Sequence, residues 1–188
     1  MTSPVFDAVV LAGGASRRLG TDKALVEVGG RRLLDRVLDA VVHADRTVVV
    51  GPHRPVARPV LWSAEDPAGG GPAAGLQAGL ALVRAPVVVV LATDLPFIDG
   101  DVVGALLAAV QPDGGAVLVD DDGHEQLTAG AWPTSALRRA AVAPAHGRSL
   151  RSLLAPLPRT GVGGWSGDRP ASLDCDTAAD VARAEALV

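Results

Sequence analysis

The amino-acid sequence predicts a three-layer α/β fold in which helices cover both faces of a mostly parallel mixed sheet. Three short, nearly continuous apolar runs lie at residues 6–12, 46–51 and 86–92. Such runs are typical of strands that are buried on both faces. Segments with helical spacing of apolar residues separate the runs, and that alternation is typical of βαβ units with a parallel core.

The first elements follow from this pattern in order. Residues 6–12 predict a central strand that ends at Gly13 and Gly14, and the apolar spacing within residues 33–44 predicts a helix that packs back on it. Residues 46–51 predict the second strand. Residues 72–83 then predict a second helix, and residues 86–92 the third strand.

The second half of the chain is expected to extend the sheet, in part with antiparallel strands. A helix, two strands and a second helix, which follows a Thr or Ser cap, are predicted at residues 102–110, 115–119, 127–132 and 134–142. Residues 156–170 are rich in Pro and Gly and predict a surface excursion. A last strand and a last helix are predicted at residues 172–175 and 180–188.

Length and composition indicate one domain over residues 1–188, since 188 residues with 48% hydrophobic content are enough for one core. The chain starts without a basic segment followed by a long apolar run. No later stretch approaches the roughly 20 apolar residues that cross a bilayer. Cys175 is the only cysteine, which excludes an internal disulfide and a cysteine-based zinc site. We therefore expect a cytoplasmic protein that binds no membrane and is a monomer or weak homo-oligomer.

Charge is distributed unevenly along the chain. The net charge of −4 argues against a general nucleic-acid surface. Residues 1–60, however, carry nine Lys and Arg against six Asp and Glu, so an anion site is expected early in the chain. Sixteen of the seventeen cationic residues are Arg, and Lys23 is the single lysine. A lysine that remains in such an arginine-rich composition favours a functional role.

The segment that follows the first strand is predicted to bind phosphates. Gly13 and Gly14 allow backbone N–H groups to face an anion, while Arg17, Arg18 and Lys23 can neutralise phosphate charge. The carboxyl edge of a parallel sheet is also where open α/β folds bind ligands. A glycine-rich turn with solvated arginines is the alternative. Adjacent glycines fit neither the G-x-x-x-x-G-K-[ST] loop nor the G-x-G-x-x-G fingerprint, which disfavours a P-loop kinase and a dehydrogenase.

Two acidic positions are candidate metal ligands. Asp94 follows the third apolar run directly, which places a carboxylate at the carboxyl end of a buried strand. Mg²⁺ needs only one or two carboxylates besides water and phosphate oxygens. Asp174 and Asp176 lie two residues apart and would share a face of a strand. Asp176 is a possible second ligand, and a solvated strand end is the alternative. The acidic run 120–122 predicts an exposed hairpin turn.

These motifs resemble those of the molybdenum cofactor guanylyltransferases. Leu11-Ala12-Gly13-Gly14, Ser16-Arg17-Arg18-Leu19-Gly20 and Asp22-Lys23 match that family's first signature, with Leu19 in place of its usual methionine. Similar motifs follow in order at Gly71-Pro72-Ala73-Ala74-Gly75, Thr93-Asp94-Leu95-Pro96-Phe97, Glu125-Gln126-Leu127 and Asp174-Cys175-Asp176-Thr177. The resemblance therefore covers nearly the whole chain and implies a Rossmann-like nucleotidyltransferase fold.

The resemblance also implies an activity and a set of site residues. The expected reaction transfers GMP from GTP to the phosphate of molybdopterin and releases pyrophosphate, with Mg²⁺ held by Asp94. Lys23, Arg17 and Asp94 would be catalytic, and Asp66 would recognise guanine. The expected nucleotide-binding residues are Leu11, Ala12, Gly13, Gly14, Lys23, Asp66, Gly71, Pro72 and Asp94.

Three alternatives remain open at this point. The related cytidylyltransferases tend to carry aspartates where this family has asparagines, and this chain has Asp174 and Asp176 there. A cytidylyltransferase, or a relative that acts on another phosphorylated acceptor, is therefore the nearest alternative. A non-catalytic nucleotide-binding regulator is the other, although the presence of Lys23 together with Asp94 argues against it.

Overall fold

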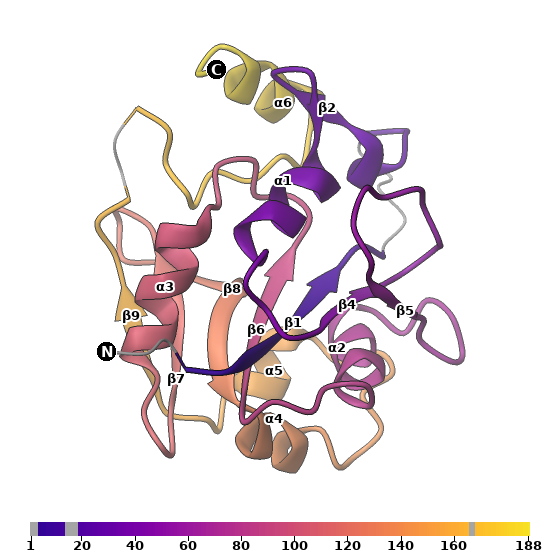
Figure 1. The fold of residues 1–188 in the computed structure, drawn as a ribbon, viewed down its shortest axis with the longest axis vertical. Coiled ribbons are helices and arrows are strands. Elements are labelled where there is room, and N and C mark those ends of the chain that lie inside the picture. The colour runs from indigo at the N-terminus through magenta and orange to yellow at the C-terminus, as the bar shows by residue number, and fades with distance from the viewer. Residues whose placement is uncertain (1–3, 14–18, 166–167) are drawn as a thin grey trace.

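A seven-stranded sheet forms the centre of the computed structural model, which describes residues 4–13, 19–165 and 168–188 (Figure 1). Its strands follow the order β5-β4-β1-β6-β8-β7-β9. Only the pairs β6–β8 and β8–β7 are antiparallel. The strands are β1 Phe6–Leu11, β4 Thr47–Val50, β5 Leu61–Ser63, β6 Val87–Ala92, β7 Gly115–Val119, β8 Glu125–Pro133 and β9 Arg159–Val162. This mixed, mostly parallel sheet confirms the predicted fold class.

Helices cover both faces of the sheet. One face carries α1 (Leu33–Ala40) and α3 (Gly100–Ala109). The opposite face carries α2 (Pro72–Leu80), α4 (Thr134–Ala140) and α5 (Leu150–Leu154). The short elements η1 (Lys23–Leu25), β2 (Glu27–Val28) and β3 (Arg31–Arg32), and the last helix α6 (Ala178–Glu185), lie beyond one end of the sheet (Figure 1).

The continuous apolar runs reflect burial on both faces of the central strands. In β1, Ala8 and Val10 pack in the core beneath α1 and α3, while Val9 and Leu11 pack in the core beneath α2. All six residues of β1 are buried. A polar residue every second position would face one of these two cores, and for this reason the strand shows no alternation.

The carboxyl ends of three parallel strands meet at one edge. Leu11 at the end of β1 is level with Val50 of β4 and with Ala92 of β6. Ala12 N donates to Val50 O at 2.8 Å, and Thr93 N donates to Leu11 O at 3.3 Å. The loops after β1, β4 and β6 therefore leave the sheet side by side, at the edge where open α/β sheets bind ligands.

The structure corrects several expected elements. Residues 172–175 form no strand; the backbone N–H of Cys175 instead donates to Asp94 O in a loop. The excursion at 156–170 contains β9, an edge strand that pairs in parallel with β7. Thr134 is not an N-cap, because its buried hydroxyl donates to Ala85 O. None of the helices in the described ranges has the length and apolar character to cross a bilayer.

Two helical glycines give a test of packing between α2 and the sheet. A Cβ at Gly79 would lie 2.7 Å from a methyl group of Val9 and 3.0 Å from one of Val50, whereas a Cβ at Gly104 in α3 meets nothing within 4 Å. We expect Gly79→Ala to lower the free energy of unfolding by about 1–3 kcal/mol through overpacking. Gly104→Ala should raise it by about 0.5–1 kcal/mol. Urea denaturation of both variants measures these changes, and a stabilised Gly79→Ala would contradict the packing.

Candidate active site

Lys23 is positioned by the turn that precedes it. Asp22 is the N-cap of η1, and its carboxylate accepts from Ala24 N at 3.2 Å. The turn directs the Lys23 side chain toward the carboxyl edge of the sheet, where its ammonium lies 3.0 Å from Asp94 Oδ2 and also pairs with Asp176 Oδ1. Three segments from distant parts of the sequence thus meet at one ammonium group.

The charges of this cluster determine the protonation of Lys23. Burial of the ammonium group disfavours its charged form, but the neighbouring carboxylates of Asp94 and Asp176 outweigh that cost and raise the pKa of Lys23. Lys23 is therefore a fixed positive charge at neutral pH. The pKa of Asp174 is raised by burial and by the negative charges of Asp176 and Asp94.

Asp176 reaches the site because the residues before it are anchored. Cys175 N donates to Asp94 O at 2.9 Å, and the Cys175 side chain is fully buried in a small apolar cluster with Val28, Leu33, Leu173 and Ala184. Burial raises the pKa of the Cys175 thiol to about 11, so the thiol is neutral and serves packing. Thr177 then starts α6 with a capping box to Asp180.

Arg54 is a site residue that the sequence pattern did not reveal. Its guanidinium forms two hydrogen bonds with the Asp22 carboxylate, at 2.7 and 2.8 Å, and a third with Pro52 O at 3.0 Å. The side chain is only 7% exposed. A paired geometry of this kind fixes the orientation of both groups. Arg54 therefore ties the turn that carries Lys23 to the loop after β4.

This arrangement gives a second prediction. Arg54→Lys cannot reproduce the paired bonds to Asp22, so the turn before Lys23 loses its orientation. We expect kcat at saturating nucleotide to fall about 10- to 100-fold, as when a catalytic group is misplaced by about 1 Å. Pyrophosphate release measures this effect. Arg58→Lys is the matched control, since Arg58 lies in the same loop but donates to Leu38 O and Val42 O, away from the site. Equal rates for both variants would refute a positioning role.

The start of the glycine loop lies against the loop after β4. A Cβ on Gly51 would lie 2.8 Å from the carbonyl carbon and oxygen of Ala12 and 2.9 Å from Gly13 N. Gly51 also has φ of 143°, which side chains disfavour. Only glycine allows this close approach, so Gly51 is a second site residue that the sequence pattern did not reveal. The side chains of Leu11 and Ala12 are buried, which leaves their backbone to face a ligand.

The proposed base-recognition segment lies between β5 and α2. Asp66 is exposed, whereas Glu65 accepts from Gly69 N at 3.1 Å through Oε1 and has a buried Oε2 with no partner among the described residues. Gly71, with φ of 86°, is the N-cap of α2, and Pro72 is its first residue. Glu65 and Asp66 therefore both offer a carboxylate oxygen beside this helix start.

Some expectations fall outside the described residues or away from the site. Gly14 and Arg17 lie outside the described ranges. The predicted turn at 120–122 is confirmed: Asp120 accepts from Asp122 N and His124 N in an exposed hairpin turn between β7 and β8. In the described part of the chain, these three are the only carboxylate, His or Cys ligand atoms that converge in a group of three. The turn geometry itself accounts for their closeness.

Asp94 has the donor that a hard cation needs. Its Oδ2 pairs with Lys23, while its Oδ1 is buried and has no hydrogen-bond partner in the described ranges. An unpaired buried carboxylate oxygen costs free energy unless a cation or donor binds it. Asp176, 46% exposed, contributes a second carboxylate from the other side of Lys23. The residues present are thus compatible with a divalent cation at Asp94.

Comparisons with known proteins agree with this site. The model of the MobA-like NTP transferase domain matches residues 8–161. A probable molybdenum cofactor guanylyltransferase from Opitutus terrae is 37% identical, over 80% of this chain and 78% of the relative. The molybdenum cofactor guanylyltransferase of Rhodobacter capsulatus is 33% identical, over 70% of each chain. The chain spans between about two thirds and four fifths of the length of the first curated relatives.

A solved structure shares the fold. Molybdopterin-guanine dinucleotide biosynthesis protein A from Archaeoglobus fulgidus superposes with a TM-score of 0.74 at 22% identity, over 96% of this chain and 97% of that chain. The identity is low, so this similarity bears on the fold alone. The family expected from the glycine loop and the Asp94 motif is confirmed by the match over most of the chain. The chain therefore belongs to the family of MobA-like NTP transferase domains.

Proposed function

We propose that the chain transfers GMP from GTP to the terminal phosphate of molybdopterin and releases pyrophosphate. The observation that supports this most directly is the meeting of Lys23, Asp94 and Asp176 at the sheet edge beside Gly13. A fixed ammonium next to a carboxylate oxygen without a partner is suited to a bound triphosphate and its counter-ion. Membership of the family and the activities named for the relatives support the choice of GTP and of the acceptor.

The chemistry asks little of protein acids and bases. A phosphate monoester has its second pKa at about 6, so the acceptor is largely dianionic at neutral pH and attacks the α-phosphorus without a general base. The P–O bond to pyrophosphate breaks as the new P–O bond forms. The protein has to align the two phosphates and neutralise their charge. Lys23 holds positive charge at the reacting groups, and the backbone at Gly13 and the turn held by Arg54 fix its position relative to the sheet.

Mg²⁺ belongs to this proposal as the expected cofactor. Asp94 would hold it through the oxygen that has no partner in the described ranges, and Asp176 is the candidate second ligand. When bound, Mg²⁺ supplies charge neutralisation on the phosphate oxygens. The carboxylates that now bind the Lys23 ammonium would then share their negative charge between lysine and metal.

The base preference gives a third prediction. A carboxylate that accepts from guanine N1–H and its amino group is left unpaired by cytosine or adenine, which costs roughly 1–3 kcal/mol. We expect kcat/KM for GTP to exceed that for CTP and ATP about 10- to 100-fold. Asp66→Ala should remove most of this preference while it slows turnover at saturating GTP only modestly. Pyrophosphate release with four NTPs, with and without molybdopterin, measures both effects.

The matched comparison is Glu65→Gln. If the preference is lost in this variant and kept in Asp66→Ala, Glu65 reads the base. Equal use of GTP and CTP by the unaltered protein would favour a cytidylyltransferase, the alternative supported by Asp174 and Asp176. Binding of nucleotide without any release of pyrophosphate would favour a non-catalytic regulator.

A further inference from the structure

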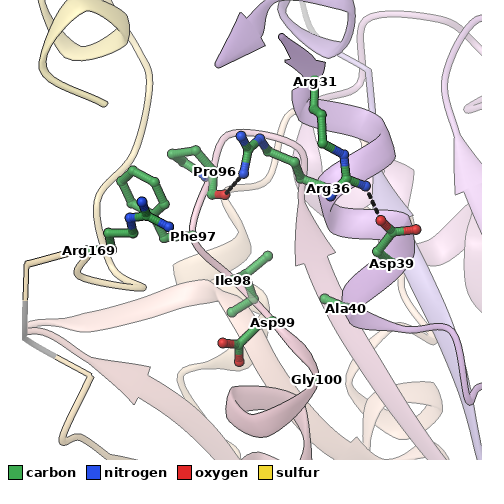
Figure 2. Close-up of a pocket in the computed structure, with 10 residues that line it drawn as sticks. All are labelled: Arg31, Arg36, Asp39, Ala40, Pro96, Phe97, Ile98, Asp99, Gly100 and Arg169. Atoms are coloured by element: carbon green, nitrogen blue, oxygen red, sulfur yellow. Dashed lines mark hydrogen bonds and ion pairs between the residues drawn. The ribbon is translucent and has the colours of Figure 1, made fainter. Parts of the chain in front are cut away.

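A second cavity, lined by basic side chains, lies between α1, the loop before α3 and the segment before α6. Its volume is about 320 Å³, at the lower end of the range for small-ligand pockets. Arg31 from β3, Arg36 from α1 and Arg169 from the segment that leads to Leu173 all line it (Figure 2). Three guanidinium groups from three separate segments thus face one space.

The arginines are held in place mainly by neutral partners. Arg36 donates to Val28 O at 3.0 Å and to Pro96 O at 3.4 Å, and Arg169 donates to Leu187 O at 2.6 Å and to Val188 O at 3.0 Å. Backbone carbonyls orient a guanidinium and leave its charge in place. Only Arg31 is paired with a carboxylate, that of Asp39.

The cavity therefore has an excess of positive charge. Two carboxylates line it in the described ranges, but that of Asp99 accepts from Asp101 N and Val102 N at the start of α3. Burial and repulsion from Arg31 and Arg169 lower the pKa of Arg36, with partial compensation from Glu185. Like charges that face one cavity repel each other, and an anion placed among them relieves that repulsion.

We propose that this cavity binds a compact oxyanion, such as a phosphate or carboxylate group, at a site separate from Lys23. Its two walls lead directly to the candidate active site. Pro96 and Phe97 follow Asp94, and Arg169 precedes Asp174 and the Cys175 N–H that bonds to Asp94 O. The oxyanion is either a second anionic group of the acceptor or a free inorganic anion. Only the first of these sources rests on the proposed function.

Inorganic phosphate is the probe for the site itself. Calorimetric titrations at low salt are carried out in a Lys23→Met background, which removes the known cation of the active site. We expect Arg36→Gln and Arg169→Gln each to weaken phosphate binding about 3- to 10-fold, as for a partly exposed ion pair. Asp39→Asn should tighten binding, since Arg31 loses its competing partner. Added NaCl should weaken it.

Arg139→Gln is the matched control, because Arg139 is exposed on α4, which covers the opposite face of the sheet. It should leave phosphate binding unchanged. No binding in the Lys23→Met background, or equal affinity in all arginine variants, would overturn the site. Circular dichroism checks each fold, and Asp39→Asn tests the site without the loss of any arginine. These titrations need no turnover, so a failure of the proposed function leaves them interpretable.

Steady-state kinetics in the presence of Lys23 then identifies the source of the oxyanion. If it is part of the acceptor, Arg169→Gln raises KM for molybdopterin about 3- to 10-fold and leaves KM for GTP unchanged, and phosphate competes with the acceptor. If it is a free anion, KM for molybdopterin is unchanged and phosphate does not compete with it. Both results support a binding site in the cavity.

Discussion

Replacement of Asp94 by asparagine is expected to lower kcat about 10²- to 10³-fold or more and to leave the fold intact. The buried Oδ1, which has no partner among the described residues, is the oxygen we assign to the metal, and an amide carries no charge to hold it. Lys23 keeps Asp176 as a partner in the variant, so the cluster retains an ion pair. Pyrophosphate release in saturating Mg²⁺ measures the loss, and circular dichroism checks the fold.

Asp113→Asn is the control for this change. Asp113 is an exposed aspartate in the turn before β7, far along the chain from the site. It tests whether the loss of one negative charge from a protein of net charge −4 has any effect by itself. Near-normal activity of Asp94→Asn would exclude Asp94 as the metal ligand, whatever the control shows.

Replacement of Lys23 by arginine is the second change with a large expected effect, a fall in kcat of about 10²-fold. The ammonium lies between two carboxylates, and its side chain is only 16% exposed. A planar guanidinium is larger and cannot act as a compact point charge in that space. Lys23→Met should cost more, because it also leaves the carboxylates of Asp94 and Asp176 facing each other without a cation.

The reverse exchange is the control for the lysine. Arg139→Lys, on an exposed face of α4, keeps a charge and changes only its shape, so it should not alter kcat. If Lys23→Arg retained most activity, any cation at position 23 would serve. The scarcity of lysine in this chain would then reflect composition alone.

The sequence allowed the sheet core and the centre of the site to be predicted for physical reasons. Burial on both faces produces uninterrupted apolar runs, and the ends of β1 and β6 place Gly13 and Asp94 at one edge whatever the rest of the chain does. The single lysine was informative because composition made it exceptional. These features are local, so one sequence is enough to find them.

Other parts of the site depend on contacts between distant segments. Arg54 carries no local signal: it is one of sixteen arginines, and only its paired bonds to Asp22 distinguish it. Gly51 is one of 22 glycines, and its role depends on the approach of Ala12. Residues 172–175 alternate like a strand, but their hydrogen bonding goes to the loop at Asp94 and not to a sheet. Edge strand β9 was not predicted because its residues are half exposed.

The anchoring of Cys175 to Asp94 has a consequence for how the site is completed during synthesis. Lys23 and Asp94 lie on the first half of the chain, but Asp176 lies 153 residues after Lys23. During translation the sheet strands from β1 to β9 leave the ribosome before the segment with Asp176 does. That segment packs in its own small apolar cluster, apart from the two large cores. A cluster of that size can open locally while the sheet stays folded. The last carboxylate of the site therefore arrives after the scaffold and is the first that local unfolding removes.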